Sequence, residues 1–139
     1  MDRDDLGFLL AKATQRWNEL LRERFRAAGW GEVRPGYGSI LVPLFEQDGL
    51  RMGELARRSR LSKQTMTTMV RLLEREQLVR RERDPDDGRA YRIVLTAKAR
   101  RFEPVAEGTL AELGALALEL LGESRLAALK RDLKEWIET

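Results

Sequence analysis

Residues 62–95 read SKQTMTTMVRLLEREQLVRRERDPDDGRAYRIVL, and this stretch decides the fold. Its first half carries apolar residues three and four positions apart, which is the spacing of one buried helix face. These residues are Met66, Met69, Val70 and Leu73. Ser62 is a favourable N-cap residue. The pattern therefore predicts a helix over about residues 62–76.

A change of pattern follows this helix. Residues 78–83 and 89–95 are extended runs, and between them lies the turn sequence DPDDG, residues 84–88. Two such runs around a turn favour a β-hairpin over about 78–95. A helix that leads directly into a basic hairpin is typical of a recognition helix and its wing.

Upstream of this unit, the sequence predicts further short helices. Met52–Ser59 forms two turns with Leu55 and Ala56 facing inward, and another helix runs over about 35–45. Pro35 suits the first turn of that helix, whereas Pro43 should kink or shorten it.

The two ends of the chain are predicted to be long amphipathic helices. One spans about residues 5–28, and the other begins after Thr96 as N-cap and is disturbed near Pro104. Gly122 ends that helix, and a last helix starts near Ser124. The expected fold class is mainly α with a small β-hairpin wing. It is a winged helix–turn–helix over 35–96 between helices at 1–30 and 97–139, all in one domain of residues 1–139.

Composition excludes several classes of protein. The 139 residues include no Cys and no His, which removes disulfides, thiolate zinc sites, the Ser-His-Asp triad and the commonest metal ligand. No paired carboxylates or glycine-rich phosphate loop stand out, so we expect no enzyme, no metal and no cofactor. The acidic start and the lack of a membrane-length apolar run favour a cytoplasmic protein without membrane contact.

Charge is unevenly distributed along the chain. Residues 51–101 hold 15 Lys and Arg against 7 Asp and Glu, whereas the remainder holds 11 against 16. A basic middle between acidic ends indicates a local site for a polyanion. Arginine outnumbers lysine 21 to 5, which suits forked contacts with phosphates and guanine edges.

The outward face of helix 62–76 can read bases. On a helical wheel, Gln64, Thr68, Arg71 and Arg75 lie opposite the buried face, and Thr65 and Thr67 flank them. Gln pairs with adenine, Arg with guanine, and Thr with a polar edge or a thymine methyl group. Three threonines in four positions are poor for helix stability, which indicates a functional reason for them.

The hairpin adds a second set of cations. Arg80, Arg81, Arg83, Arg89 and Arg92 surround a turn with three carboxylates. Asp87 lies two residues from Arg89 and can pair with it, which would preset Arg89 for a narrow minor groove.

These stretches resemble the MarR family of transcriptional regulators. The matching pieces are GELAR at 53–57, LSKQTMT at 61–67, LERE at 73–76, DPDDGRA at 84–90 and the closing LT at 95–96. The resemblance implies a homodimer held by the terminal helices, which binds a pseudo-palindromic operator in double-stranded DNA. The DNA-binding residues expected are Ser62, Lys63, Gln64, Thr65, Thr67, Thr68, Arg71, Arg83, Asp87 and Arg89.

Some residues depart from the family pattern. Arg71 stands where the family usually has an acidic residue that helps to fix the wing, and Leu72 replaces a common arginine. Gln77 and Arg60 occupy positions often given to glycine. If Gln77 is left-handed, its backbone is strained by about 1 kcal/mol.

The residues themselves also favour a homodimer. The terminal helices carry more large apolar side chains than one thin core could cover, including Trp17, Phe25, Trp136 and Ile137. A twofold partner would bury this excess and repeat the recognition helix about 34 Å away.

A small-molecule effector is a further expectation of the resemblance, which implies a repressor or activator often relieved by an amphipathic or phenolic ligand. Trp17, Tyr37 and Phe45 are candidates to line an apolar pocket between the two parts of the chain. The alternative to a DNA-binding regulator is a winged-helix module that docks an acidic protein partner. The threonines and Gln64 on the outward face suit a groove better than a protein hot spot, which favours aromatic residues.

Overall fold

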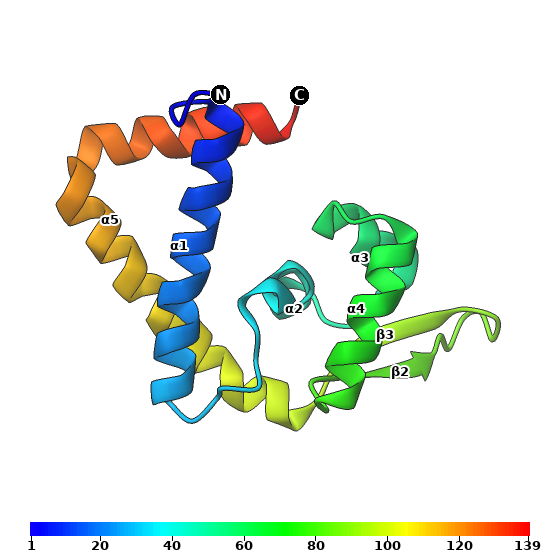
Figure 1. The fold of residues 1–139 in the computed structure, drawn as a ribbon. Coiled ribbons are helices and arrows are strands. Elements are labelled where there is room, and N and C mark those ends of the chain that lie inside the picture. Colours follow the sequence, from blue (N-terminus) through cyan, green and yellow to red (C-terminus); the bar gives the residue numbers. More distant parts are fainter.

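The computed structural model describes residues 1–139 and shows a helical arm beside a smaller lobe (Figure 1). The arm consists of α1 (Leu6–Ala27) and the long α5 (Ala97–Ile137), which contact each other. The lobe contains η1 (Pro35–Tyr37), α2 (Gly38–Glu46), β1 (Leu50–Arg51), α3 (Met52–Ser59), α4 (Lys63–Arg75), β2 (Val79–Arg83) and β3 (Tyr91–Leu95). The expectation of a mainly helical chain with a winged helix–turn–helix is confirmed.

The wing is an antiparallel sheet with strand order β1-β3-β2. Leu50 pairs with Ile93, and Val79 pairs with Leu95. The sequence predicted β2 and β3 but not β1. A two-residue strand is too short to show alternation, and β1 exists only because β3 lies beside it.

A tight turn joins α3 to α4, which is the predicted recognition helix. α3 ends at Ser59, and Arg60 adopts a left-handed conformation with φ 53° before α4 begins at Lys63. Leu55 of α3 and Met66 of α4 are fully buried in the shared core. The short turn therefore fixes the angle between the two helices.

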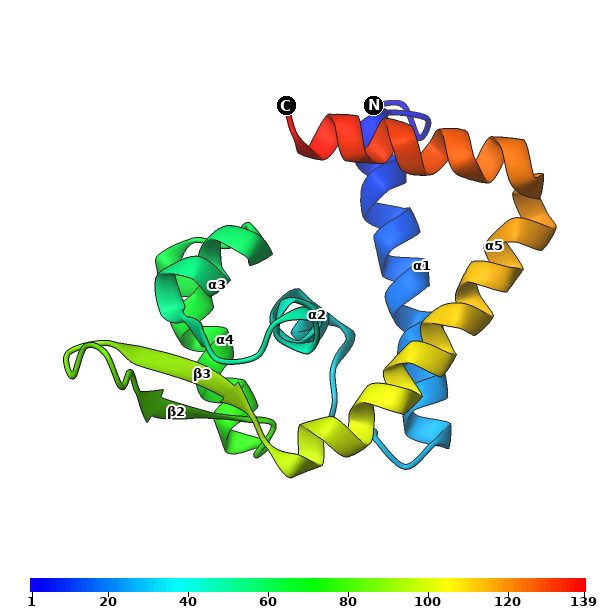
Figure 2. The ribbon, with the colours of Figure 1, turned by 180° about the vertical axis from the view of Figure 1, so that it is seen from behind.

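The core joins the lobe to the arm. Phe102 of α5 lies edge-on to Phe25 of α1 with ring centroids 5.0 Å apart, and its ring is 5.2 Å from that of Trp30. Ile40 and Leu44 of α2 are fully buried in the same cluster. α2 thus lies between the helical arm and the recognition unit, as both views show (Figures 1 and 2).

Two prolines lie inside helices without breaking them. Pro43 lies within α2, which ends three residues later at Glu46, and Pro104 lies within α5. The predicted disturbance near Pro104 is wrong, because Gly122 is the non-helical residue inside α5.

Gly122 bends α5 sharply. Its φ of 79° and ψ of 166° belong to a region that is essentially limited to glycine. Beyond this bend, α5 crosses back toward the N-terminal end of α1, so that the two chain ends lie near each other (Figures 1 and 2). No helix has an apolar stretch long enough to cross a membrane.

Candidate DNA-binding surface

The N-terminus of α4 is capped by Ser62. Its hydroxyl oxygen accepts a hydrogen bond from the backbone N–H of Thr65 at 3.1 Å, and its hydroxyl group donates to Thr65 Oγ1 at 2.9 Å. Because Met66, Val70 and Leu73 are completely buried, the opposite face of α4 is presented to solvent. The exposed side chains of α4 are Lys63, Gln64, Thr65, Thr68, Arg71, Leu72 and Arg75.

Two of the threonine hydroxyls on α4 are engaged within the helix. Thr67 Oγ1 lies 2.9 Å from the Lys63 carbonyl oxygen, and Thr68 Oγ1 lies 3.2 Å from that of Gln64. A carbonyl oxygen carries no hydrogen, so in each pair the hydroxyl is the donor. Thr67 is also half-buried, whereas Thr68 remains exposed.

A buried carboxylate fixes the base of the wing. Asp84 is only 2% exposed, and its Oδ2 accepts hydrogen bonds from Arg51 Nε at 2.6 Å and from Arg92 Nε at 3.3 Å. Its Oδ1 accepts from the backbone N–H of Asp86 at 2.8 Å. Asp84 thereby ties β1, β3 and the turn together.

The ionisation of Asp84 follows from these bonds. The N–H of Asp86 and then the Arg51 guanidinium favour the carboxylate strongly enough to outweigh burial, and the pKa of Asp84 is lowered to about 2. The same hydrogen bond and the charge of Asp84 raise the pKa of Arg51. The exposed Arg51 side chain is therefore held against the buried carboxylate of Asp84 as an ion pair.

Sequence reasoning missed this role of Asp84. The bond between its side chain and the Asp86 N–H is an Asx turn, and the Asp84-Pro85 pair is a signal for such a turn. The partner Arg51 lies 33 residues away along the chain, and no local pattern points to it. The bonds of Asp84 to Arg51, Arg92 and the Asp86 N–H, which we call the Asp84 clamp, fix the wing from β1.

The turn of the wing differs from the prediction in two respects. β3 begins at Tyr91, so Arg89 belongs to the turn and not to the strand. The predicted ion pair of Asp87 with the Arg89 side chain is wrong: Asp87 Oδ1 accepts from the backbone N–H of Arg89 at 3.0 Å. The backbone N–H of Arg89 is nearer to the Asp87 carboxylate than the guanidinium is, and a bond to it does not require the Arg89 side chain to be ordered. The Arg89 guanidinium is left without an internal partner.

Arg83 is held within the wing. Its Nη1 donates to the carbonyl oxygen of Gly88 at 2.8 Å, and its guanidinium lies 5.7 Å from the ring centre of Tyr91. Its position beside the turn is as predicted, but part of its donor capacity is already used.

Cations of the basic middle fall into paired and unpaired sets. Carboxylates of the same segment form ion pairs with arginines that lie away from the outward face of α4. Arg57 and Arg58 pair with Glu54, Arg80 with Glu82, and Arg81 with Glu74. The exposed cations whose side chains form no hydrogen bond or ion pair within the chain we call the free cations. They are Arg60, Lys63, Arg71, Arg75, Arg89 and Arg101. All but Arg101 lie on the helix–turn–helix or at the tip of the wing.

The C-terminal end of α4 is held by the first turn of α5. Lys98 Nζ donates to the carbonyl oxygen of Glu76 at 2.9 Å, and Thr96 Oγ1 donates to that of Gln77 at 2.6 Å. Gln77 is left-handed with φ 60°, as its glycine-like position predicts. Lys98 Nζ is also 3.4 Å from Glu32 Oε1 in the segment after α1.

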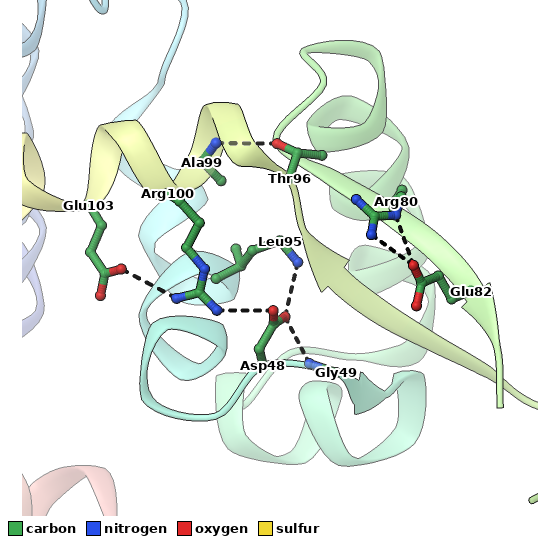
Figure 3. Close-up of polar contacts among 9 residues, drawn as sticks. All are labelled: Asp48, Gly49, Arg80, Glu82, Leu95, Thr96, Ala99, Arg100 and Glu103. Atoms are coloured by element: carbon green, nitrogen blue, oxygen red, sulfur yellow. Dashed lines mark hydrogen bonds and ion pairs between the residues drawn. The ribbon is translucent and has the colours of Figure 1, made fainter. Parts of the chain in front are cut away.

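A second polar cluster joins the same end of α5 to the sheet (Figure 3). Asp48 Oδ1 accepts from the backbone N–H groups of Gly49 at 2.8 Å and Leu95 at 2.9 Å, and its Oδ2 is 3.0 Å from Arg100 Nη2. Arg100 also pairs with Glu103. These bonds fix the direction in which α5 leaves the wing.

An apolar cavity of about 210 Å³ lies between the arm and α2. Trp17 of α1, Phe45 of α2 and Phe102 of α5 are among the residues that line it. Tyr37 was predicted to line the same pocket, and this is wrong. Its side chain packs in the core at 5% exposure, and it borders an adjoining polar groove with Arg22 and Arg34. No group of three or more potential metal-ligating side chains is found.

Comparison with known proteins now adds to this geometry. The model of the MarR family matches residues 36–91, which span η1 to the start of β3. No curated protein matches the chain.

Solved structures match over nearly the whole length. A probable transcriptional regulator from Pseudomonas aeruginosa is 27% identical with a TM-score of 0.82, covering 96% of this chain and 97% of its own. The transcriptional repressor CouR, bound to a 23-mer DNA duplex, is 25% identical with a TM-score of 0.82, covering 99% and 98%. The PcaV transcriptional regulator from Streptomyces coelicolor, in complex with its natural ligand, is 23% identical with a TM-score of 0.79, covering 99% and 95%. Residues 36–91 are a MarR-family winged helix–turn–helix domain, and the chain as a whole has the fold of the MarR-family transcriptional regulators.

Proposed function

We propose that the chain is a cytoplasmic, homodimeric transcriptional repressor that binds a pseudo-palindromic operator in double-stranded DNA and is released by a small-molecule ligand. The observation that carries the DNA-binding part is the set of free cations on the outward face of α4 and at the wing tip. Internal carboxylates neutralise most other arginines of the basic middle, so these remain for an external polyanion. The related repressor CouR, bound to DNA, supports the same reading.

The division of the chain is part of this proposal. Residues 1–30 and 97–139 serve as dimerisation helices, and residues 35–96 serve as the DNA-binding unit. Within it, α4 enters the major groove and Arg89 reaches a minor groove. Ser62, Lys63, Gln64, Thr65, Thr67, Thr68, Arg71, Arg83 and Asp87 are assigned to the same interface, either in contact with DNA or in fixing the elements that are.

The homodimer is supported by apolar side chains that one chain leaves uncovered. Every residue from 131 to 139 is exposed, including Trp136 at 60% and Ile137 at 53%. Further exposed apolar residues lie at the N-terminal end of α1, at Leu6, Phe8 and Leu9. Large apolar side chains left exposed on both terminal helices favour burial against a partner, and a second copy supplies a self-complementary one.

Release by a ligand is supported by the position of the apolar cavity. Its wall includes Phe102, which lies one helical turn after Lys98 on α5. Lys98 holds the C-terminal carbonyl of α4. A ligand that moves this part of α5 therefore displaces the recognition helix. An aromatic ring with one polar group fits a cavity lined by Trp17 and Phe45, and the ligand-bound relative PcaV supports such a site.

The DNA-binding part is tested by fluorescence anisotropy with DNA from upstream of the chain's own gene, against a scrambled duplex, over a range of salt concentrations. We expect preferential binding by at least ~1,000-fold, falling steeply with salt. Arg71→Gln should weaken binding, whereas Arg81→Gln should not, because Arg81 is already paired with Glu74. Absence of binding to either duplex at low salt would overturn the proposal and favour a module that docks an acidic protein.

The ligand part has its own test. Titration with 4-hydroxybenzoate as a phenolic probe, followed by tryptophan fluorescence, should quench the wild-type protein more than the Trp17→Phe variant. The same probe should release bound DNA. Equal quenching in both proteins would show that the cavity beside Trp17 is not the binding site.

A further inference from the structure

Thr68 offers an external partner no hydroxyl hydrogen. That hydrogen is directed to the Gln64 carbonyl oxygen one turn earlier. A hydroxyl group has only one hydrogen, so this bond uses the whole donor capacity of the Thr68 side chain. What remains exposed on Thr68 is its methyl group together with the lone pairs of the oxygen.

Leu72 lies one turn further along the same face of α4. Residues four apart on a helix are neighbours on its surface, and Leu72 is 36% exposed. Leu72 is not a member of the hydrophobic core cluster. Thr68 and Leu72 together form what we call the methyl strip. It is an apolar band on α4 between Gln64 and Arg75, the last residue of the helix.

Thr65 differs from Thr68 in the use of its hydroxyl. Its oxygen accepts a hydrogen bond from Ser62, and no internal acceptor takes its own hydrogen. The Gln64 side chain likewise has no internal partner. Thr65 and Gln64 are thus free to donate to a base edge, whereas the methyl strip is suited to apolar contact.

We infer that the methyl strip is a specificity-determining element that reads the C5-methyl groups of thymines in the major groove. This inference rests on the proposed DNA-binding function and names the bases that the interface selects. Apolar contact with the thymine methyl group is an established means of direct readout, and among the four bases only thymine presents that group in the major groove. Hydrogen-bond readout then falls to Gln64 and Thr65.

The inference explains two features that local stability does not. A threonine in mid-helix disfavours the helix relative to alanine, and an exposed leucine among cations gains nothing in the free protein. Against a thymine methyl group, both become buried apolar surface.

The test uses a duplex selected by the wild-type protein from a random library. Each thymine is replaced singly by deoxyuridine, which removes only the methyl group. The wild type should lose about fourfold in affinity at one or more thymines in each half-site, the effect of exposing a single methyl group. All dissociation constants are measured by anisotropy at one salt concentration.

Matched variants separate the methyl group from the hydroxyl. Thr68→Val keeps a methyl group at this position and should keep the preference for thymine over uracil. Thr68→Ser keeps the hydroxyl and should lose that preference at one position, and Leu72→Ala should lose it at another. Thr65→Val, the control on the same helix, should weaken binding to both duplexes alike.

Several results would overturn the inference. One is a wild type whose affinity is unchanged by every thymine-to-uracil replacement. Another is a Thr68→Ser variant that keeps the full preference for thymine over uracil. A third is a Thr68→Val variant that binds at least tenfold more weakly, because the Thr68 oxygen would then accept a hydrogen bond from a base amino group. If the library yields no enriched duplex, the proposed function fails, and the inference falls with it.

Discussion

Replacement of Arg89 by glutamine removes a charge that the protein does not use internally. The Asp87 carboxylate is bonded to the Arg89 backbone, so the wing turn keeps its shape when the side chain is changed. Arg80 provides the matched control. It lies in the same hairpin, but Glu82 is 2.8 Å from its guanidinium, so the pair carries no net charge toward DNA.

The magnitude follows from counterion release. Each phosphate contact contributes about 0.9 to the slope of log affinity against log salt. A homodimer has two copies of Arg89, so Arg89→Gln should reduce the magnitude of the slope by about 1.8. Between 50 and 200 mM salt, the wild type should therefore lose roughly tenfold more affinity than the variant does. Arg80→Gln should leave the slope within about 0.5 of the wild-type value.

The assay is anisotropy with one labelled operator duplex at five or more salt concentrations, with the circular dichroism of each variant as a check on folding. Equal slopes for wild type and Arg89→Gln would refute the assignment of Arg89 to the interface. A reduction by Arg80→Gln as large as that by Arg89→Gln would refute the distinction between free and paired cations.

Three further predictions concern the framework of the interface. The stabilisation from ionised Asp84 is complete above its unfolded pKa of 3.8 and is lost as the pH falls toward about 2. In urea denaturation, the free energies of unfolding of the wild type and Asp84→Asn should therefore converge over this range. A constant difference between them would contradict the role of the Asp84 ion pairs in stability. Gly122→Ala should cost about 1–3 kcal/mol at the bend and weaken self-association in sedimentation equilibrium, whereas Gly108→Ala, at an open helical position, should not. Ser62→Ala should lower the free energy of unfolding by about 1 kcal/mol through loss of the α4 cap, and unchanged urea midpoints would argue against that cap.

Local sequence patterns were sufficient to predict the helices and the hairpin. The apolar spacing in 62–76 and the DPDDG turn each depend on residues near one another in sequence, and α4 (Lys63–Arg75) and β2 (Val79–Arg83) match closely. Gly122 was also recognisable, because a glycine after a long apolar stripe is a frequent helix stop.

Contacts between residues far apart along the chain could not be predicted from the sequence. Arg51 is one of many arginines in a basic segment, and only the pairing of β1 with β3 brings it to Asp84. Tyr37 resembled Trp17 and Phe45 as an aromatic at helical spacing, but the 3-10 turn directs it into the core. The partner of Asp87 was mistaken for a guanidinium because an adjacent opposite charge is visible in sequence, whereas a backbone cap depends on the turn conformation.

The central claim is that a homodimer reads DNA sequence through two copies of α4. Selection of duplexes from a random library by the wild-type protein, followed by sequencing, tests it most directly. We expect an inverted repeat whose half-site centres lie about one helical turn apart, roughly 10 base pairs. Enrichment of a single unrepeated motif, or of no motif at all, would contradict it.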